Sequence, residues 1–570
     1  MSARKKRWVL RDPAPPAVLS SMRHLAPVVA TLLYQRGIRD KASVDAFLSS
    51  DYKSGLHDPF LLKGMDAAAR RVAAAIAERE PIVVYGDFDT DGVTAVTLLV
   101  QAITAMGGEI RPYIPHRLRE GYGLNTEAID QLAAEGVRVL LTVDCGISNV
   151  REVAYAREQG LDVIVTDHHT PPDILPDAFA IVNPKQPGCE YPFKQLVGVG
   201  IAYKLVQALA RLGLKMPLRG RDLLDVVALG TVTDMGPLQG ENRILVRAGL
   251  ESINATQRAG LKALILAAGL VQGKVTSTDI SFMLGPRLNA AGRLDDAVLA
   301  YKLLLADDPA AAQGFAEELN KANRRRQEMT KEIQQVARQQ ADDLGKTERP
   351  IVILDSADFP AGLVGLVAAR LVEDLGRPVL MLERGETTSR GSARSVPDFN
   401  IIEALTSCDD LFVRYGGHSA AAGFTIETEK LPELEERLLA YAAERLPDTE
   451  QLPPLDIDAE VPLAHLSWEL LAQIAVLEPF GQANPQPVLM SRRVHVSGAW
   501  PRGAEGQHLK LRIDDGRGGP SFDAIAFRLG NLAGYFAKYP WIDIAYVLEA
   551  HEWNGNRTLQ LNIKDLRRAQ

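Results

Sequence analysis

The chain has 570 residues, 46% of them hydrophobic and 24% charged, so it is long enough for several globular domains with separate cores. Its formal net charge of −8 weakly disfavours nucleic acid as a partner, although local clusters of Lys and Arg matter more than the total. Three widely spaced cysteines argue against a disulfide framework or a zinc cluster. Prolines interrupt the basic amino terminus where a signal peptide needs an apolar stretch. We therefore expect a cytoplasmic protein with no membrane span.

The amino-terminal residues 1–75 have the pattern of short helices separated by Gly and Pro, which is typical of a packing or capping region. From residue 76 to residue 307, short apolar runs alternate with helix-like stretches, as in parallel strands joined by crossover helices. The apolar runs lie at residues 82–89, 138–146, 161–169 and 179–184. The uncharged stretch between Asp91 and Glu109 is barely long enough to cross a bilayer and contains polar residues, so it indicates a buried helix.

Residues 308–345 form the longest polar stretch with helical periodicity and predict a long connecting helix. A second α/β pattern occupies residues 346–452, with strands expected at 351–355 and 377–383 and a helix between them. Residues 453–570 contain closely spaced strands and predict a small β-barrel. The expected fold class is therefore α/β, with a parallel-sheet domain and a second α/β domain joined by a long helix, followed by a carboxy-terminal β-barrel.

Acidic side chains stand at the end of the apolar runs of the first α/β region. Asp87, Asp89 and Asp91 occupy alternate positions where the first run ends, and alternate residues of a strand share a face. The later runs end at Asp144, at Asp167-His168-His169 and, in a further apolar segment over residues 223–234, at Asp234. Because the carboxyl ends of parallel strands converge on one crevice, we expect these side chains to meet there.

Several carboxylates packed in a crevice repel one another unless cations neutralise them. Carboxylates with one or two imidazoles suit Mn²⁺ or Mg²⁺, whereas structural zinc usually requires paired cysteines. Two such ions about 3.5–4 Å apart would activate a water and stabilise the leaving oxygen of a phosphodiester, so phosphoester hydrolysis is the first hypothesis. Each motif alone is ambiguous, since the Asp triplet also fits a calcium loop or a polar turn and Asp-His-His also fits a helix cap. Their occurrence together and in order favours the metal site.

These motifs resemble those of the DHH phosphoesterase superfamily, which is named for the triplet at residues 167–169. Residues 85–95, 143–147, 165–169 and 230–234 are similar, in the expected order, to its four metal-binding motifs. The resemblance implies two divalent cations, Mn²⁺ or Mg²⁺, with Asp144 as the bridging ligand. The implied metal ligands are Asp89, Asp91, Asp144, His168 and Asp234. The catalytic residues implied to orient ligands or to contact the scissile phosphate are Asp87, Asp167 and His169.

Three further segments, at residues 116–125, 285–297 and 477–487, resemble the RecJ branch of this superfamily in particular. The second α/β domain carries residues 391–395 and 416–423, which are similar to the DHH-associated substrate domain, and the barrel resembles an oligonucleotide-binding (OB) fold. This resemblance implies a 5′-to-3′ exonuclease that degrades single-stranded DNA to 5′-mononucleotides in DNA repair and recombination. It also implies a monomer that acts on single-stranded DNA with a 5′ end, beside a helicase and a single-strand-binding protein.

Substrate contacts follow from the same motifs. Charge-assisted hydrogen bonds to a 5′-phosphate and its neighbours are predicted from Arg117, Arg293, Ser392, Arg394 and His418. Each arginine taken alone also fits an ordinary surface residue. Base stacking is predicted for Trp500, Phe522, Phe527 and Trp553, although alternating aromatics in strands are often core residues.

Two shorter segments carry less information. The Gly198-Val199-Gly200 sequence is too short for a phosphate loop and indicates close helix packing. Where related enzymes often show a Trp-His pair before a helix, this chain has Phe359-Pro360, so the role of that pair in placing substrate is in question here.

Two alternative functions remain open. A DHH phosphatase or nano-RNase acting on short oligonucleotides, pAp or cyclic dinucleotides needs only the two α/β domains, whereas this chain adds a barrel and an amino-terminal region. A non-catalytic replication scaffold corresponds to family members that have lost metal ligands, whereas this chain keeps the complete set of aspartates. Both differences favour the exonuclease.

Overall fold

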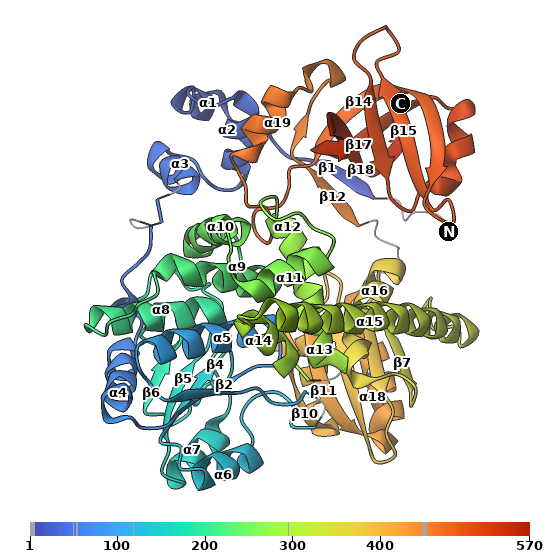
Figure 1. The fold of residues 1–570 in the computed structure, drawn as a ribbon. Coiled ribbons are helices and arrows are strands. Elements are labelled where there is room, and N and C mark those ends of the chain that lie inside the picture. The colour runs from blue at the N-terminus through green and yellow to red at the C-terminus, as the bar shows by residue number, and fades with distance from the viewer. Residues whose placement is uncertain are drawn as a thin grey trace. The chain divides into compact units, whose positions relative to one another are not determined.

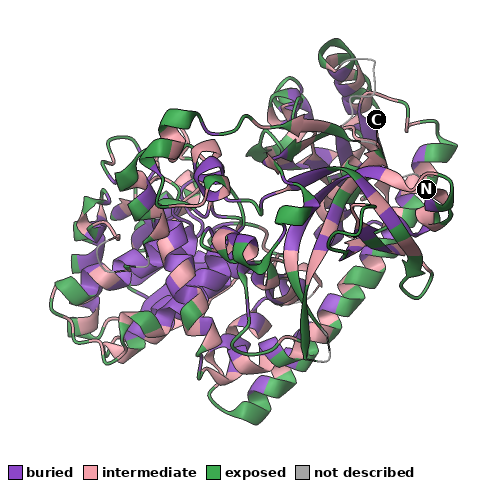
Figure 2. Ribbon diagram, turned by 90° about the horizontal axis from the view of Figure 1, so that it is seen from above, coloured by how far each residue is buried: buried purple, intermediate pink, exposed green. Residues whose placement is uncertain are grey.

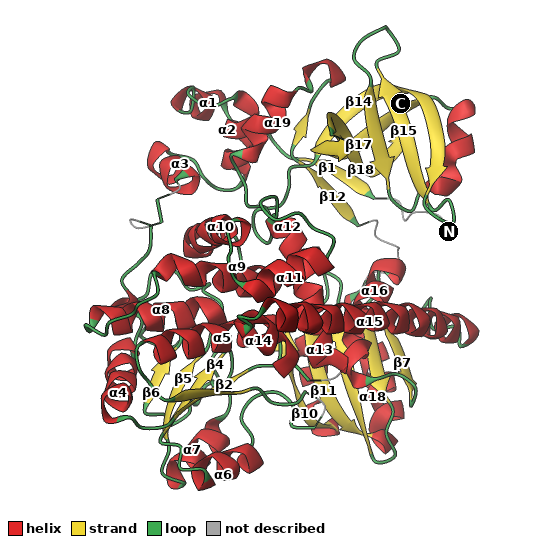
Figure 3. Cartoon of the chain, viewed as in Figure 1, coloured by secondary structure: helices red, strands yellow, loops and turns green. Residues whose placement is uncertain are grey.

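The computed structural model describes residues 6–49, 51–52, 55–117, 119–294, 296–446, 453–553 and 555–569. The chain forms two compact units, each described here by itself. One unit is continuous and spans residues 50–450, whereas the other combines residues 1–49 with residues 451–570. Figure 1 shows the elements of each unit, and Figure 3 shows that the first is rich in helices and the second is dominated by strands.

The first α/β domain is built on a parallel sheet with the strand order β3-β2-β4-β5-β6. Its strands are β2 (Ile82–Gly86), β3 (Ile110–Tyr113), β4 (Val139–Val143), β5 (Asp162–Thr166) and β6 (Ala180–Val182). All four predicted apolar runs form strands, and β3 adds an edge strand that the pattern did not predict. After β2, the chain adds β3 on one side of that strand and then β4 on the other side. A change of direction of this kind is expected to leave a crevice beside the carboxyl ends of β2 and β4.

The helices of this domain cover the sheet and pack on one another. They are α4 (Met65–Glu78), α5 (Thr90–Ala105), α6 (Thr126–Ala134), α7 (Val150–Glu158), α8 (Gly198–Arg211), α9 (Leu224–Thr233), α10 (Gly240–Asn254), α11 (Ala259–Ala267), α12 (Ser277–Asp279), α13 (Gly285–Leu294) and α14 (Val298–Leu305). Helix α5 packs on α8 and α9 and is buried along nearly its whole length, and buried residues, purple in Figure 2, fill the interior of the structure. No helix of the described residues is long and apolar enough to cross a membrane.

The segment at residues 223–234 differs from its prediction, because it forms helix α9 and not a strand. Every residue from Leu224 to Val232 is buried. An apolar run that is buried on all sides has no polar face, so its periodicity does not distinguish a helix from a central strand.

Helix α15 (Pro309–Asp343) is the long helix expected over residues 308–345. Asp308 caps its amino terminus by accepting a hydrogen bond from the Ala311 backbone N–H at 2.8 Å. Along its length α15 packs first on α11, α13 and α14 of the first α/β domain and then on α16 and β7 of the second. It therefore connects the two domains within one unit.

The second α/β domain has the strand order β10-β11-β9-β8-β7, in which only β7 and β8 are parallel. Its elements are β7 (Val352–Ser356), α16 (Ala361–Leu375), β8 (Val379–Glu383), β9 (Thr388–Arg394), α17 (Ile401–Thr406), β10 (Phe412–His418), β11 (Ala421–Glu427) and α18 (Leu431–Arg445). Helix α16 packs on one face of the sheet, against Val379 and Met381. Helices α17 and α18 cover the other face, against Leu380 and Leu382.

The other unit is an OB-type barrel that is closed by pairing of β14 with β17. Its strands are β13 (Ala459–Glu460), β14 (Leu489–Arg502), β15 (His508–Asp514), β16 (Phe522–Ala526), β17 (Trp541–Trp553) and β18 (Asn556–Arg568), and β12 (Pro454–Ile457) lies in a separate two-stranded sheet. The apolar core contains Leu509, Leu511 and Ile544 from these strands and also includes Leu32 and Leu33 from the amino-terminal helices.

The predicted amino-terminal helical region, residues 1–75, is divided between the two units. Its helices α1 (Pro16–Ser21), α2 (Pro27–Gln35) and α3 (Lys41–Leu48) belong to the barrel unit, together with α19 (Trp468–Ala475). The region also contains a strand, β1 (Arg7–Leu10), which pairs in parallel with β12. By contrast, α4 packs on α8 and β6 of the first α/β domain. Local periodicity does not reveal which distant surface a short helix covers.

Candidate metal centre

The first carboxylates lie where β2 passes into α5. Asp87 follows the strand directly, Asp89 is the N-cap of α5, and Asp91 lies in its first turn. The Asp89 carboxylate accepts hydrogen bonds from the backbone N–H groups of Asp91 at 2.9 Å and Gly92 at 3.1 Å. The three aspartates therefore do not share a strand face as predicted, because the chain turns into a helix at the second of them. A Cβ at Gly92 would lie 2.4 Å from the Asp87 carbonyl oxygen, so this turn requires glycine.

Asp91 is held by the amino terminus of α8. Its Oδ2 accepts a hydrogen bond from the Gly198 N–H at 2.6 Å, and its Oδ1 accepts one from the Val199 N–H at 2.8 Å. A Cβ at Gly198 would lie 2.7 Å from the Cβ of Asp144, so the glycine also permits close approach to a second carboxylate. The free N–H groups and the dipole of a helix amino terminus stabilise negative charge. This segment, predicted only to allow close packing, positions a candidate ligand.

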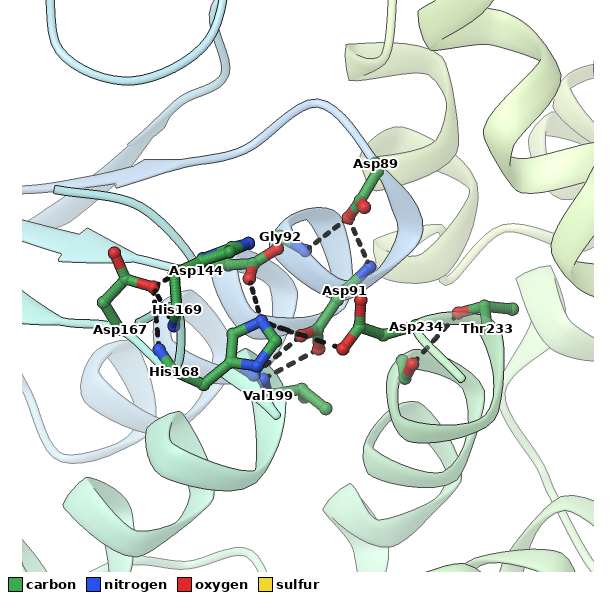
Figure 4. Close-up of polar contacts among 12 residues, drawn as sticks. Asp89, Asp91, Gly92, Asp144, Asp167, His168, His169, Val199, Thr233 and Asp234 are labelled. Carbon is green, nitrogen blue, oxygen red and sulfur yellow. Dashed lines mark hydrogen bonds and ion pairs between the residues drawn. The ribbon is translucent and has the colours of Figure 1, made fainter. Parts of the chain in front are cut away.

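His168 lies at the centre of the carboxylates (Figure 4). Its Nε2 is 2.9 Å from Asp144 Oδ1, 3.7 Å from Asp234 Oδ2 and 3.9 Å from Asp91 Oδ2. Asp144 follows β4 with a φ of 60°, a conformation that is strained for a non-glycine residue. Asp234 follows α9, so it reaches the group from a helix end and not from the predicted strand end.

Asp167 and His169 form a separate hydrogen-bonded pair. Asp167 Oδ1 accepts hydrogen bonds from the His168 and His169 backbone N–H groups at 2.7 and 3.0 Å and lies 2.8 Å from His169 Nδ1. Its Oδ2 accepts one from the Ile147 N–H at 3.0 Å. The Tyr122 hydroxyl donates to the Asp144 carbonyl oxygen at 3.1 Å and lies 3.2 Å from His169 Nδ1. Asp167 is thus occupied by protein donors, which is an arrangement that suits a residue that orients its neighbours.

Burial and mutual repulsion oppose ionisation of the central carboxylates. Burial and then the charge of nearby aspartates raise the pKa of Asp91 to about 7 and that of Asp234 to about 9. The same causes raise the pKa of Asp144 well above its ordinary value, and burial with Asp89 does so for Asp87. Burial lowers the pKa of His168 to about 3, so its imidazole is neutral at physiological pH and suited to bind a cation.

Asp167 shows the opposite behaviour. Its burial opposes ionisation, but the hydrogen bond and charge of His169 outweigh that effect and lower the pKa of Asp167. The pKa of His169 is raised, because its bond to Asp167 outweighs burial. The pairing therefore favours the carboxylate form of Asp167 and the protonated form of His169.

The central group fits two divalent cations. Among the described residues, the buried atoms without a hydrogen-bond partner include Asp87 Oδ1, Asp144 Oδ1 and His168 Nε2. Three sets of side chains have ligand atoms within 4.8 Å of one another: Asp91 with His168 and Asp234, Asp87 with Asp89 and Asp144, and Asp144 with His168 and His169. Asp144 belongs to two of these sets, one with His168 and His169 and one with Asp87 and Asp89, so its carboxylate lies near ligand atoms of both. The oxygen and imidazole donors suit Mn²⁺ or Mg²⁺.

Three of the predicted substrate arginines form a second cluster beside the carboxylates. Arg117 lies over the Phe88 ring at 4.7 Å, Arg293 is in the last turn of α13, and Arg394 ends β9. Burial and then Arg117 lower the pKa of Arg293 to about 9, and the same two causes lower the pKa of Arg394. Arg117 is attracted to Asp87 and Asp89, although burial lowers its pKa. Among the described residues, no carboxylate forms an ion pair with these guanidinium groups.

The second α/β domain contributes the remaining predicted contacts. Arg394 donates to Ser392 Oγ at 2.8 Å, which fixes the guanidinium on the sheet. His418 is exposed at the end of β10, and its charge acts on His168 of the first domain. A Cβ at Gly362 would lie 2.3 Å from the Arg293 carbonyl oxygen, so the start of α16 packs directly on the end of α13. Residues from both domains therefore surround one site.

The aromatic residues predicted to stack on bases differ in how exposed they are. Phe522 is 7% exposed and belongs to the barrel core, so its ring has no free face and the stacking prediction is wrong for this residue. Trp500 is 45% exposed and Phe527 is 55% exposed, as a stacking role requires. The Trp553 side chain lies outside the described residues. Phe359, which stands where related enzymes often have a Trp-His pair, is 1% exposed and packs against α16. That helix starts after Pro360.

Several residues of the site were not identified from the sequence. Lys185, on the loop after β6, is half-buried, and its charge acts on Asp167 and Asp234. Asn289 Oδ1 accepts hydrogen bonds from the Thr90 N–H and hydroxyl at 2.8 Å and so braces the start of α5. Tyr122 and Asn289 lie in segments 116–125 and 285–297, which resemble the RecJ branch, but within them only Arg117 and Arg293 were predicted to have a role.

Family models match three parts of the chain: the DHH family N-terminal domain over residues 81–231, the DHHA1 domain over residues 348–444, and the RecJ OB domain over residues 457–565. A single-stranded-DNA-specific exonuclease RecJ from Bacillus subtilis is 37% identical, over 99% of this chain and 71% of its own length. The protein of the same name from Salmonella typhimurium is 35% identical, over 95% of this chain and 96% of its own length.

Solved structures agree with these matches. A crystal structure of RecJ in complex with Mn²⁺ from Thermus thermophilus has a TM-score of 0.83 and 33% identity, and the match covers 99% of this chain and 80% of that one. A crystal structure of exonuclease RecJ bound to manganese has a TM-score of 0.59 and 39% identity, over 68% of this chain and 96% of that one. Both similar structures contain the cation that the geometry of this site suits.

Proposed function

The chain belongs to the RecJ family of single-stranded-DNA-specific exonucleases, and we propose that it hydrolyses single-stranded DNA from the 5′ end to 5′-mononucleotides. The observation that carries this proposal is the group of buried carboxylates around His168 with unpaired ligand atoms, next to arginines that have no carboxylate partner among the described residues. Anionic and cationic clusters side by side suit a phosphodiester bound through cations on one side and directly on the other.

The carboxylates would hold two Mn²⁺ or Mg²⁺ ions. One ion would bind Asp91, His168 and Asp234, the other would bind Asp87 and Asp89, and Asp144 would contact both. When bound, such ions activate a water and stabilise the leaving oxygen of a phosphodiester. The amino terminus of α8 fixes Asp91 in position and opposes part of the rise in its pKa, and His168 is ready to bind because its ring is neutral.

His169 would donate a hydrogen bond to the scissile phosphate. Its Nδ1 is engaged with Asp167 and Tyr122, so its Nε2 is left for the substrate. Asp167 raises the pKa of this imidazole, which favours the protonated form that donates to a phosphate oxygen. Asp167 would therefore act as a positioning residue through His169.

The arginine cluster would hold the terminal 5′-phosphate. Arg117, Arg293 and Arg394 repel one another, and a phosphate between them would remove that repulsion. Ser392 fixes Arg394, and His418 would contact the next phosphate from the exposed edge of β10. A pocket for a terminal phosphate beside the metal centre gives a physical reason for cleavage from the 5′ end.

The test is cleavage of end-labelled single-stranded DNA with Mn²⁺ or Mg²⁺, compared with an RNA strand and with Asp144→Ala. We expect 5′-mononucleotides from DNA and no product from the variant. Release of nucleotides from the 3′ end, or no cleavage at all, contradicts the proposal, and the second result favours a non-catalytic scaffold.

A second experiment separates the exonuclease from a phosphoesterase of short substrates. Residues 50–450 form a compact unit, whereas deleting residues 453–570 alone would expose the apolar helices of residues 1–49. We therefore expect the 50–450 fragment to retain cleavage of dinucleotides and to lose most cleavage of long strands. Equal activity of the fragment and the full chain on long strands argues for the small-substrate enzyme.

We further propose that this enzyme is a monomer that works in the cytoplasm beside a helicase and a single-strand-binding protein, in DNA repair and recombination. Duplex DNA yields single strands only after strand separation, and separated strands are coated by binding proteins. Stimulation of cleavage on a blunt duplex by an added helicase would test this partnership.

A further inference from the structure

The loop that follows β6 carries a lysine, Lys185, beside the metal centre. Strand β6 lies next to β5, whose end carries the Asp-His-His triplet, and Thr166 of β5 pairs with Val182 of β6 (Figure 1). The Asp167 backbone N–H donates a hydrogen bond to the Val182 carbonyl oxygen at 3.1 Å. The residues after β6 therefore start directly beside the triplet.

A buried asparagine fixes this loop to the triplet. Asn183 is 0% exposed, and its Nδ2 donates a hydrogen bond to the His169 carbonyl oxygen at 2.9 Å. Its Oδ1 accepts a hydrogen bond from the Lys185 backbone N–H at 2.8 Å. On the other side of Lys185, the buried Gln186 side chain donates from Nε2 to two backbone carbonyl oxygens at 2.7 and 3.1 Å. The Lys185 backbone is thus held from both sides.

The Lys185 ammonium keeps its N–H donors for a ligand. The residue is half-buried, and among the described residues its side chain forms neither a hydrogen bond nor an ion pair. Burial lowers the pKa of Lys185, while the charges of Asp167 and Asp234 act in the opposite direction. A lysine that served only to neutralise Asp234 would be expected to form an ion pair with it. The free donors therefore indicate a different anionic partner.

Lys185 and the arginines act on different carboxylates of the metal centre. Two of the arginines that would hold the terminal phosphate are attracted to Asp89, and one of these also to Asp87. Lys185 instead opposes the rise in the pKa of Asp234 that burial and the neighbouring aspartates cause. Asp87 and Asp89 belong to one set of ligand atoms, and Asp234 belongs to another. Cations therefore lie beside both sets.

This arrangement matches the order of phosphates along a strand. Release of a 5′-mononucleotide breaks the first linkage, between nucleotides 1 and 2. The phosphate of that linkage therefore lies at the metal centre when the terminal phosphate lies at the arginines. The phosphate of the second linkage, between nucleotides 2 and 3, then lies past the metal centre. An ammonium group is a point-charge partner for a phosphate oxygen.

We propose that Lys185 binds the phosphate of the second linkage and so favours substrates of at least three nucleotides. The inference rests on the proposed function, because it takes a strand held by its 5′ end as the substrate. A contact at this phosphate would hold the strand on both sides of the linkage that is cleaved, and such positioning accelerates the reaction. A dinucleotide has no second linkage and would gain nothing from Lys185.

The test uses the full chain with saturating Mn²⁺ and two 5′-phosphorylated trinucleotides. One has ordinary linkages, and the other has a neutral methylphosphonate as its second linkage. The variants are Lys185→Gln, which removes the charge, and Lys185→Arg, which keeps it. The matched control is Lys63→Gln, because Lys63 is an exposed lysine whose ammonium donates to the Pro187 carbonyl oxygen of the same loop at 2.8 Å.

We expect Lys185→Gln to lower kcat/KM on the ordinary trinucleotide about tenfold, as for the loss of one charged hydrogen bond. The methylphosphonate should cost the unchanged protein about the same factor, and on that substrate Lys185→Gln should match the unchanged protein within about twofold. Lys185→Arg should keep most of the activity, and Lys63→Gln should keep all of it.

Three results overturn the proposal. Equal losses of Lys185→Gln on both trinucleotides assign Lys185 to the metal centre or to the fold. No loss on either substrate removes it from the reaction. An unchanged protein that cleaves both trinucleotides equally well shows that the second phosphate has no partner. Thermal unfolding of Lys185→Gln and Lys63→Gln is compared as well, and a folding defect in the variant would not imitate the expected result, because it lowers both rates alike.

A binding measurement separates this proposal from the proposed function. If the unchanged protein releases no 5′-mononucleotide from the ordinary trinucleotide, the proposed function fails. The affinities of the metal-free protein for the two trinucleotides, measured with a chelator present, still decide the role of Lys185. The ordinary trinucleotide should bind more tightly than the methylphosphonate, and Lys185→Gln should abolish that difference. A difference that persists in Lys185→Gln assigns the second phosphate to another residue and overturns the proposal.

Discussion

A carboxylate cluster and a neighbouring arginine cluster differ in which parts of the chain supply their side chains. The carboxylate cluster, Asp87, Asp89, Asp91, Asp144 and Asp234 around His168, comes entirely from the first α/β domain. The arginine cluster, Arg117, Arg293 and Arg394, combines a loop and a helix end of that domain with a strand end of the second. Burial and repulsion raise pKa values in the first cluster and lower them in the other. In each cluster the like charges oppose one another, so a ligand of opposite charge should stabilise it.

The difference indicates what each cluster depends on. The carboxylates are fixed by strand ends and helix caps within one sheet, so they are expected to keep their geometry whatever the second domain does. The arginines meet only while α16 packs on the end of α13, where Gly362 contacts the Arg293 backbone. Cation binding should therefore depend on the first α/β domain alone, whereas recognition of a terminal phosphate should depend on how the two α/β domains pack on each other.

The largest expected effect is loss of the bridging carboxylate. Asp144→Asn should reduce cleavage by about a thousandfold or more, because bound cations supply several kcal/mol of transition-state stabilisation and each ~1.4 kcal/mol is a factor of ten. Without cations the variant should be at least as stable as the unchanged protein, because one buried, repelled carboxyl is gone. Calorimetry with and without Mn²⁺ measures the stability, and a single-strand cleavage assay measures the activity.

The control for this variant is Asp173→Asn, an exposed aspartate outside the site, which should change neither property. If Asp144→Asn keeps the full stabilisation by Mn²⁺, the carboxylate cluster is not the cation site, and the contrast between the clusters is lost.

The next effect concerns the junction between the domains. Arg394→Gln should lower kcat/KM on 5′-phosphorylated strands by about ten- to a hundredfold, since a charged hydrogen bond contributes about 1.5–3 kcal/mol. Cleavage of strands with a 5′-hydroxyl should change little. Arg390→Gln, an exposed arginine at the other end of β9, is the matched control. A retained preference for phosphorylated ends would remove Arg394 from the pocket.

The sequence predicted the carboxylate cluster better than the arginine cluster, for a physical reason. Asp87, Asp144 and Asp167 follow their strands directly, so the pattern of short apolar runs located them. The motif located Asp234, but the element before it was predicted as a strand and is the helix α9. The buried apolar run has no polar face that would distinguish a helix from a strand. The arginines were found only by resemblance, since no local pattern shows that a residue of β9 lies beside the end of α13.

Parts that depend on distant packing were the least predictable. Residues 1–49 pack on a barrel that begins about four hundred residues later, and short amphipathic helices carry no signal of their partner. Phe522 and Trp500 are both aromatic residues of strands, yet one points into the core and the other outward. Tyr122 and Lys185 reach the site from loops, where neither strand nor helix periodicity applies.

A smaller effect should appear in stability as pH changes. The pKa of Asp234 is about 9 in the folded chain against an ordinary value of 3.8, and that of Asp91 is about 7. For a raised carboxyl pKa, the unfolded chain loses its proton first, so stability falls as pH rises from about 4 to about 9. The Tm of metal-free protein should therefore drop by several degrees over this range, and saturating Mn²⁺ should flatten the change. A Tm that rises with pH would show that repulsion does not dominate the carboxylate cluster.

The smallest effect tests the segment that connects the clusters, which carries Arg117 at one end and Tyr122 at the other. Tyr122→Phe removes a hydroxyl that donates to the Asp144 carbonyl oxygen and lies 3.2 Å from His169 Nδ1. We expect kcat to fall by about three- to tenfold, as for one neutral hydrogen bond of about 1 kcal/mol, with stabilisation by Mn²⁺ and the preference for 5′-phosphate unchanged. Tyr155→Phe, which loses a surface bond to Asp130, is the control. A lost phosphate preference would mean that Tyr122 shapes the arginine cluster as well, and that the two clusters are coupled through this segment.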